Sequence, residues 1–157
     1  MKPLILGLGN DLISDDAIGI IAARRLHKEL SGRADVVESS LHGLALLDIF
    51  IGYDRAVIID AIGTGRVPPG TVLEIKPEDL RSTPGPSPHY TGLPEMISLA
   101  RQMQIDFPRD IKILAVEIAD NLTFGKGPTP VVADALAALT RRAVAFVQRW
   151  EDEDKNR

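Results

Sequence analysis

The sequence predicts an α/β fold: a three-layer sandwich in which helices cover both faces of a mostly parallel, twisted sheet of about five strands. Short apolar blocks rich in β-branched residues alternate along the chain with longer segments that have helical periodicity. One strand-like segment, Thr71–Ile75, alternates instead between apolar and polar residues, as an antiparallel edge strand does. This order of elements favours parallel strands joined by crossover helices.

The expected elements follow one another with short connections. Strands are expected at Leu4–Leu8, Asp35–Glu38, Arg55–Asp60, Thr71–Ile75 and Ile111–Val116, and helices at Asp16–Leu30, Leu44–Phe50, Leu93–Met103 and Pro130–Trp150. Residues 81–92 contain three prolines and two glycines, so an irregular loop is expected there. We expect a single domain over residues 1–150, followed by a charged tail at 151–157 that frays.

Composition excludes several classes of function. The net charge is −4 and no long basic run occurs, so neither nucleic acid nor an anionic membrane is an expected partner. The chain has no cysteine, which excludes disulfides, thiolate metal sites, iron–sulfur clusters and a cysteine nucleophile. No apolar run reaches the roughly 18 residues that span a bilayer. The N-terminus does not resemble a signal peptide, and the cytoplasm is the expected location.

The segment 7–19, GLGNDLISDDAIG, contains the first candidate functional residues. It joins the first strand to the first helix, where α/β folds bind ligands. Its glycines suit a dinucleotide-binding turn, and Glu38 at the end of the second strand could hold a ribose. However, Leu12 occupies the third glycine position, and Asp15 and Asp16 would repel a pyrophosphate. The segment therefore favours a cation, and a dinucleotide-binding domain is the weaker alternative.

Two carboxylates and one imidazole, from Asp16, Asp60 and His89, form the candidate site. Each has a simpler interpretation alone: a helix-start acid beside a capping Ser14, a turn aspartate after a buried strand, and a solvated loop histidine. Together they are donors suited to a divalent first-row transition ion. Three protein ligands would leave positions open for water or substrate, as in a reactive metal site. Asp15 is an alternative to Asp16.

The same motifs resemble those of a known family, the nickel–iron hydrogenase maturation endopeptidases. The resemblance is carried by the segment 7–19, Val57-Ile-Ile-Asp-Ala61, His89-Tyr-Thr-Gly-Leu93 and Phe124-Gly-Lys-Gly-Pro-Thr-Pro130. It covers nearly the whole chain, in order and at similar length. It implies a single α/β domain that removes a C-terminal extension from the precursor of the hydrogenase large subunit after nickel has been inserted.

By motif, the resemblance implies that Asp16, Asp60 and His89 are the metal-contacting and catalytic positions. It also implies that the nickel belongs to the substrate and that the protease needs no obligatory metal or small-molecule cofactor of its own. The expected partner is the nickel-loaded large-subunit precursor. The family often has Glu at position 16 and a Glu-Pro pair where this chain has Glu117-Ile118. A non-catalytic nickel-binding or chaperone module of hydrogenase assembly would use the same ligands and is the main alternative.

Overall fold

A computed structural model describes residues 1–82, 90 and 92–157, which form a five-stranded sheet in the order β2-β1-β3-β5-β4. The strands are β1 (Leu4–Leu8), β2 (Asp35–Ser39), β3 (Arg55–Ile62), β4 (Val72–Ile75) and β5 (Asp110–Glu117). The first four in the sheet order are parallel to one another, and β4 pairs antiparallel with β5 at the edge. The predicted fold class is confirmed, including its antiparallel edge strand.

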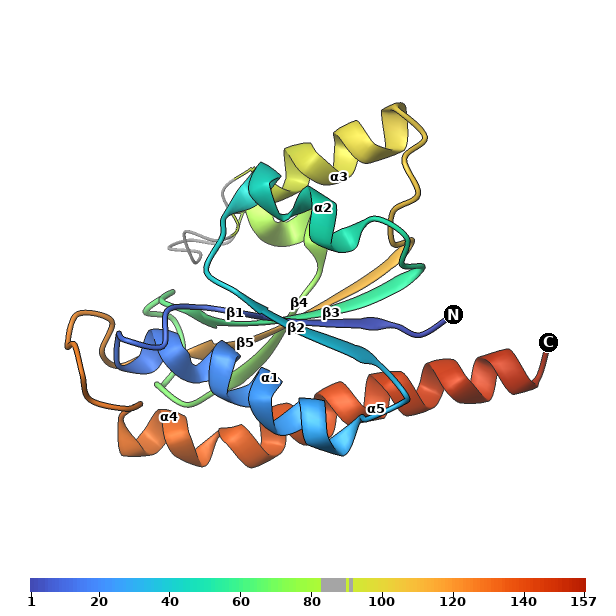
Figure 1. Ribbon diagram of the computed structural model, residues 1–157. Coiled ribbons are helices and arrows are strands. Elements are labelled where there is room, and N and C mark those ends of the chain that lie inside the picture. Colours follow the sequence, from blue (N-terminus) through green and yellow to red (C-terminus); the bar gives the residue numbers. More distant parts are fainter. Residues whose placement is uncertain (83–89, 91) are drawn as a thin grey trace.

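Helices cover both faces of the sheet, as Figure 1 shows. On one face lie α2 (Leu47–Phe50) and α3 (Leu93–Gln102), and on the other lie α1 (Ile18–Glu29), α4 (Pro130–Asp134) and α5 (Leu136–Lys155). Short 3₁₀ turns precede α1 and α2, so these two helices begin later than the sequence predicts. Within the described ranges, no helix is both long and apolar enough to cross a membrane.

The last helix differs from the expectation at both ends. The predicted helix 130–150 is interrupted at Ala135, and α5 continues through Lys155 into the segment that was expected to fray. Ion pairs explain the ordered end. Arg55 donates to both carboxylate oxygens of Asp154 at 2.9 and 3.1 Å, and Arg33 pairs with Glu151 at 2.6 Å. The charged side chains therefore tie the end of α5 to the body of the domain.

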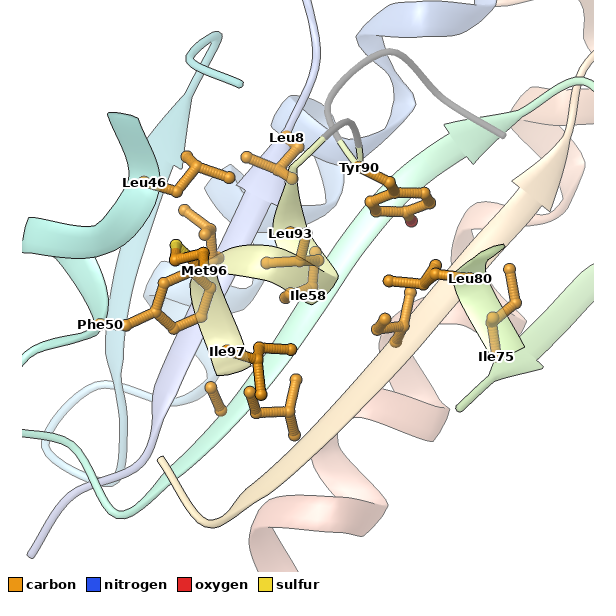
Figure 2. Close-up of a cluster of buried hydrophobic side chains, with 14 of the residues drawn as sticks. Leu8, Leu46, Phe50, Ile58, Ile75, Leu80, Tyr90, Leu93, Met96 and Ile97 are labelled. Carbon is orange, nitrogen blue, oxygen red and sulfur yellow. The ribbon is translucent and has the colours of Figure 1, made fainter. Parts of the chain in front are cut away.

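Alternating side chains of the central strands divide the core into two layers. One layer lies between the sheet and the helices α2 and α3, and Figure 2 shows its side chains; it includes Leu8, Ile58, Ile62, Phe50, Tyr90, Leu93 and Met96. The other lies against α1 and α5 and includes Ile5, Val57, Ile59, Ile18, Leu26, Phe146 and Trp150. Both faces of β1 and β3 are thus buried, which explains why β1 is apolar throughout and why β3 is apolar except at Arg55 and Asp60.

In open sheets of this kind the ligand-binding crevice lies where the strand order reverses, and here that position is between β1 and β3. From β1 the chain crosses to β2 on one side, and from β2 it returns to β3 on the other, so the order reverses at this pair. The two strands pair from Leu4↔Ala56 to Gly7↔Ile59, whereas β3 continues along β5 to Ile62. Asp60 was expected to end its strand. It lies instead inside β3, directly beyond the last residue paired with β1.

Candidate functional site

Two glycines bring the start of α1 against the end of β1 and the middle of β3. A Cβ atom on Gly19 would lie 2.1 Å from the carbonyl oxygen of Leu8 and 2.6 Å from that of Ile59. A Cβ atom on Gly7 would lie 2.3 Å from the carbonyl oxygen of Gly19. Side-chain carbon atoms do not approach backbone oxygens so closely, and only glycine fits at either position. The glycines of the motif therefore serve close packing of helix on strand.

Asp16 lies in the 3₁₀ turn Asp15–Ala17, which precedes α1 and contacts β3. Gly9 has φ +151°, and a Cβ atom there would lie 2.1 Å from the carbonyl oxygen of Asp16. The half-buried Asp16 carboxylate accepts a hydrogen bond at Oδ2 from the backbone N–H of Asn10, at 2.9 Å. This contact closes the loop on itself and fixes the direction of the carboxylate.

The expected helix cap at Ser14 is not formed. Its hydroxyl donates instead to the carbonyl oxygen of Gly127, at 3.3 Å, and makes no capping hydrogen bond. The reason is that the chain enters α1 through a 3₁₀ turn, which directs residues 14 and 15 toward the loop after β5. The adjacent acids Asp15 and Asp16 consequently have different surroundings.

Asp15 is wholly buried, and its carboxylate is surrounded by hydrogen-bond donors. The backbone N–H groups of Ala119 and Asp120 donate to Oδ2 at 2.8 and 2.7 Å. The backbone N–H and the hydroxyl of Thr129 donate to Oδ1 at 2.7 and 2.9 Å. Sequence reasoning did not find this arrangement, because the donors are more than a hundred residues away along the chain.

Asp60 is also wholly buried, and its Oδ1 accepts a hydrogen bond from the N–H of Ala61 at 2.8 Å. By alternation it lies on the same face of β3 as Ile58 and Ile62, toward the layer that contains Tyr90. Burial, and secondarily the charge of Asp60, raise the pKa of the Tyr90 hydroxyl well above its usual value. The Tyr90 side chain therefore lies near the Asp60 carboxylate of β3.

The third predicted ligand, His89, lies outside the described residues, so its place in the site stays a prediction. Its neighbour Tyr90 is buried in the layer shown in Figure 2, and among the described residues the Tyr90 hydroxyl has no hydrogen-bond partner. Over those same residues, no group of three or more histidine, aspartate or glutamate side chains is arranged to hold a metal ion. Asp16 and Asp60 come from elements that contact each other, the 3₁₀ turn and β3.

A further buried carboxylate, Glu117, ends β5 and holds the loop after β3. It accepts hydrogen bonds from the N–H and the hydroxyl of Thr64, at 2.9 and 2.8 Å, and from the N–H of Gly65 at 2.7 Å. The sequence singles out Glu117 only as a departure from the family's Glu-Pro pair. An acid at the end of a buried strand was the available signal for this structural role.

We expect Glu117→Gln to lower the free energy of unfolding by about 1–3 kcal/mol, because a glutamine NH₂ group would face backbone donors. Urea unfolding followed by circular dichroism measures the change. Glu74→Gln is the matched control, since Glu74 makes an exposed ion pair with Arg142 at 3.3 Å and should cost at most about 1 kcal/mol. Equal losses in the two variants would contradict a structural role for the Glu117 carboxylate.

The geometry does not favour the dinucleotide alternative. Glu38, the residue expected to hold a ribose, accepts hydrogen bonds from Arg24 at both carboxylate oxygens, at 2.9 and 3.0 Å. At the start of α1, where a pyrophosphate would bind, lie the acids Asp15 and Asp16.

Comparison with known proteins gives a consistent result. The family model for hydrogenase maturation proteases matches residues 20–145. The hydrogenase 2 maturation protease of Escherichia coli K12 is 30% identical over 161 residues, covering 95% of this chain and 97% of that protein. The hydrogenase expression/formation protein HupD of Rhizobium leguminosarum bv. viciae is 29% identical, covering 94% of this chain and 74% of its own length.

Solved structures agree with the sequence comparisons. The hydrogenase maturating endopeptidase HybD from E. coli superposes with a TM-score of 0.82 at 27% identity, covering 95% of this chain and 93% of that one. The family model spans most of the domain, and relatives align over almost its full length. The chain therefore belongs to the hydrogenase maturation protease family and is a peptidase.

Proposed function

We propose that this peptidase removes the C-terminal extension of a nickel–iron hydrogenase large-subunit precursor after nickel insertion, and that it recognises the precursor through the nickel that the precursor carries. The proposal is supported by the contact between the 3₁₀ turn that contains Asp16 and the strand β3 that contains Asp60, beside the crevice position expected between β1 and β3. In open α/β sheets this crevice binds the ligand.

Asp16 is the better ligand of the two adjacent acids. Both oxygens of Asp15 already accept hydrogen bonds from buried donors. The carboxylate of Asp16 is half-buried, and among the described residues it accepts a single hydrogen bond, from Asn10. It therefore retains lone pairs for a metal ion, and its exposure gives the substrate access.

In the proposed complex the nickel is part of the substrate. Asp16, Asp60 and His89 add carboxylate and imidazole ligands to an ion that the precursor already holds, and these donor types suit a divalent first-row transition metal. Coordination then places the scissile peptide beside the carboxylates, which raises its effective concentration there. A precursor without nickel lacks this anchor and is not held.

Hydrolysis then follows from positioning. The oxygen of a water molecule attacks the carbonyl carbon of the scissile peptide, the carbon–nitrogen bond breaks, and a proton passes to the leaving amine. Either the nickel or one of the site carboxylates activates the water. The products are the shortened large subunit and a free C-terminal peptide.

The decisive experiment compares two forms of one large-subunit precursor from the same organism, nickel-loaded and nickel-free. We expect the intact mass of the loaded form to fall by the mass of one C-terminal peptide, and that of the nickel-free form to stay unchanged. Mass spectrometry over a time course measures both. Equal cleavage of the two forms would disprove recognition through nickel. Binding of the loaded form without cleavage would instead support a nickel-dependent chaperone.

A further inference from the structure

We infer that Asp15 is the positioning residue of this site: its buried carboxylate fixes the loop that carries Asp16 against the loop after β5, and thereby sets where Asp16 meets the substrate. The functional part of the inference rests on the proposed function. Its structural part concerns hydrogen bonds within the chain and can be tested separately.

The hydrogen-bond donors around Asp15 fit a carboxylate and do not fit an amide of the same shape. Its oxygens receive three backbone N–H groups, from Ala119, Asp120 and Thr129, and the Thr129 hydroxyl. An asparagine of the same shape would turn an NH₂ group toward one set of these donors, whichever way its amide were oriented. Charge-assisted hydrogen bonds to a buried carboxylate are also stronger than those between neutral groups.

Asp15 lies within a ladder that joins the two loops along their length. The N–H of Asp15 donates to the carbonyl oxygen of Asp120 at 3.0 Å, which pairs with the bond from the Asp120 N–H to the Asp15 carboxylate. On the N-terminal side of Asp15, the N–H of Ser14 donates to the carbonyl oxygen of Thr123 at 2.9 Å, and the N–H of Gly125 donates to the carbonyl oxygen of Leu12 at 3.0 Å. The wholly buried Asp15 carboxylate adds to this ladder and also reaches Thr129, at the start of α4.

The hydrogen bonds of Asp15 position Asp16, because one peptide bond joins the two residues. Asp16 follows Asp15 directly, and its carboxylate is bonded to the N–H of Asn10, at the other end of the same loop. When the Asp15 carboxylate is released from its donors, the loop from residue 10 to residue 16 loses its hydrogen bonds to Ala119, Asp120 and Thr129 and keeps the backbone bonds of the ladder. The Asn10 amide proton therefore reports whether Asp16 is held in place.

The first test is hydrogen exchange in Asp15→Asn. We expect the amide protons of Asn10, Ala119 and Asp120 to exchange at least about tenfold faster than in the wild type, while amides in β3 and β5 keep their protection. Unchanged exchange at Asn10 in a folded variant would overturn the inference. This measurement needs no substrate, so it holds even if the proposed reaction is wrong.

The second test uses two threonine-to-valine variants with the same chemical change. Thr129→Val removes the hydroxyl that donates to Asp15, and Thr140→Val removes a buried hydroxyl that donates to the Leu136 carbonyl oxygen at 3.0 Å within α5. We expect Thr129→Val to lower kcat/KM for the nickel-loaded precursor about tenfold and Thr140→Val to leave it within about twofold. Thr129→Ser keeps the hydroxyl and should restore the wild-type value.

Assays are made at a temperature at which circular dichroism shows every variant to be folded. Asp15→Asn is expected to lower kcat/KM about 100-fold under these conditions, as misplacement of a reacting group by about 1 Å can do. Equal kcat/KM in Thr129→Val and Thr140→Val would show that Asp15 contributes stability alone, and would overturn the inference. If the wild type does not cleave the precursor, the proposed reaction is wrong. If the Asn10 amide nevertheless exchanges faster in Asp15→Asn, the structural role of Asp15 stands.

Discussion

Gly19→Ala is expected to lower the free energy of unfolding by about 3 kcal/mol, although alanine is the better helix former by about 1 kcal/mol. The added Cβ atom would lie 2.1 Å from the Leu8 carbonyl oxygen at the end of β1 and 2.6 Å from the Ile59 carbonyl oxygen within β3, and both are backbone atoms of central strands. No side chain can rotate to make room, so α1 must move away from the sheet. The melting temperature should fall by about 10 °C.

Gly63→Ala is the control for this substitution. Its Cβ atom would meet the side chain of Ile118 at 3.6 Å, an ordinary contact, and the φ angle of Gly63 is outside the region that favours glycine. We expect a change in the free energy of unfolding of less than about 1 kcal/mol, with either sign. Thermal and urea unfolding of both variants measure the difference. A Gly19→Ala variant as stable as the wild type would show that α1 can withdraw from the central strands at no cost.

The sequence predicts the fold well because local patterns determine it. Each central strand is an apolar block buried on both faces, and the alternation over Thr71–Ile75 correctly indicates the antiparallel edge strand β4. The end of α5 is predicted less well. A run of charged residues after Trp150 is typical of a frayed tail, and its partners Arg33 and Arg55 lie far away in the sequence. Long-range ion pairs of this kind leave no periodic signal.

The site residues stay a prediction, and the sequence indicates only those surroundings of the candidate site that depend on local patterns. The sequence identifies the loop after β1 and an acid near the end of β3, since ligands bind at these ends of parallel strands. It does not separate the roles of Asp15 and Asp16, because the separation depends on a 3₁₀ turn that directs Asp15 toward donors in the loop after β5. His89 stays a prediction from the family resemblance, as it lies outside the described residues.

Replacement of Asp16 or Asp60 by asparagine, or of His89 by alanine, is expected to lower the rate of precursor processing about 1,000-fold or more and to leave the protein folded. An amide in place of a carboxylate keeps the shape of the side chain and loses the charge that binds a metal cation. Single-turnover cleavage of the nickel-loaded precursor, followed by mass, measures the rate, and circular dichroism with thermal melting tests the fold.

Asp11→Asn is the matched control for Asp16→Asn, because both residues lie in the loop after β1. The Asp11 carboxylate is exposed and pairs with Arg24 at 3.0 Å, so its loss should change processing less than twofold. If the three ligands bind one nickel ion together, their effects are not additive. The double variant of Asp16 and Asp60 should then be little slower than either single variant. Processing at the wild-type rate in any single variant would remove that residue from the site. If the double variant is instead slowed by the product of the two single effects, Asp16 and Asp60 act on different steps.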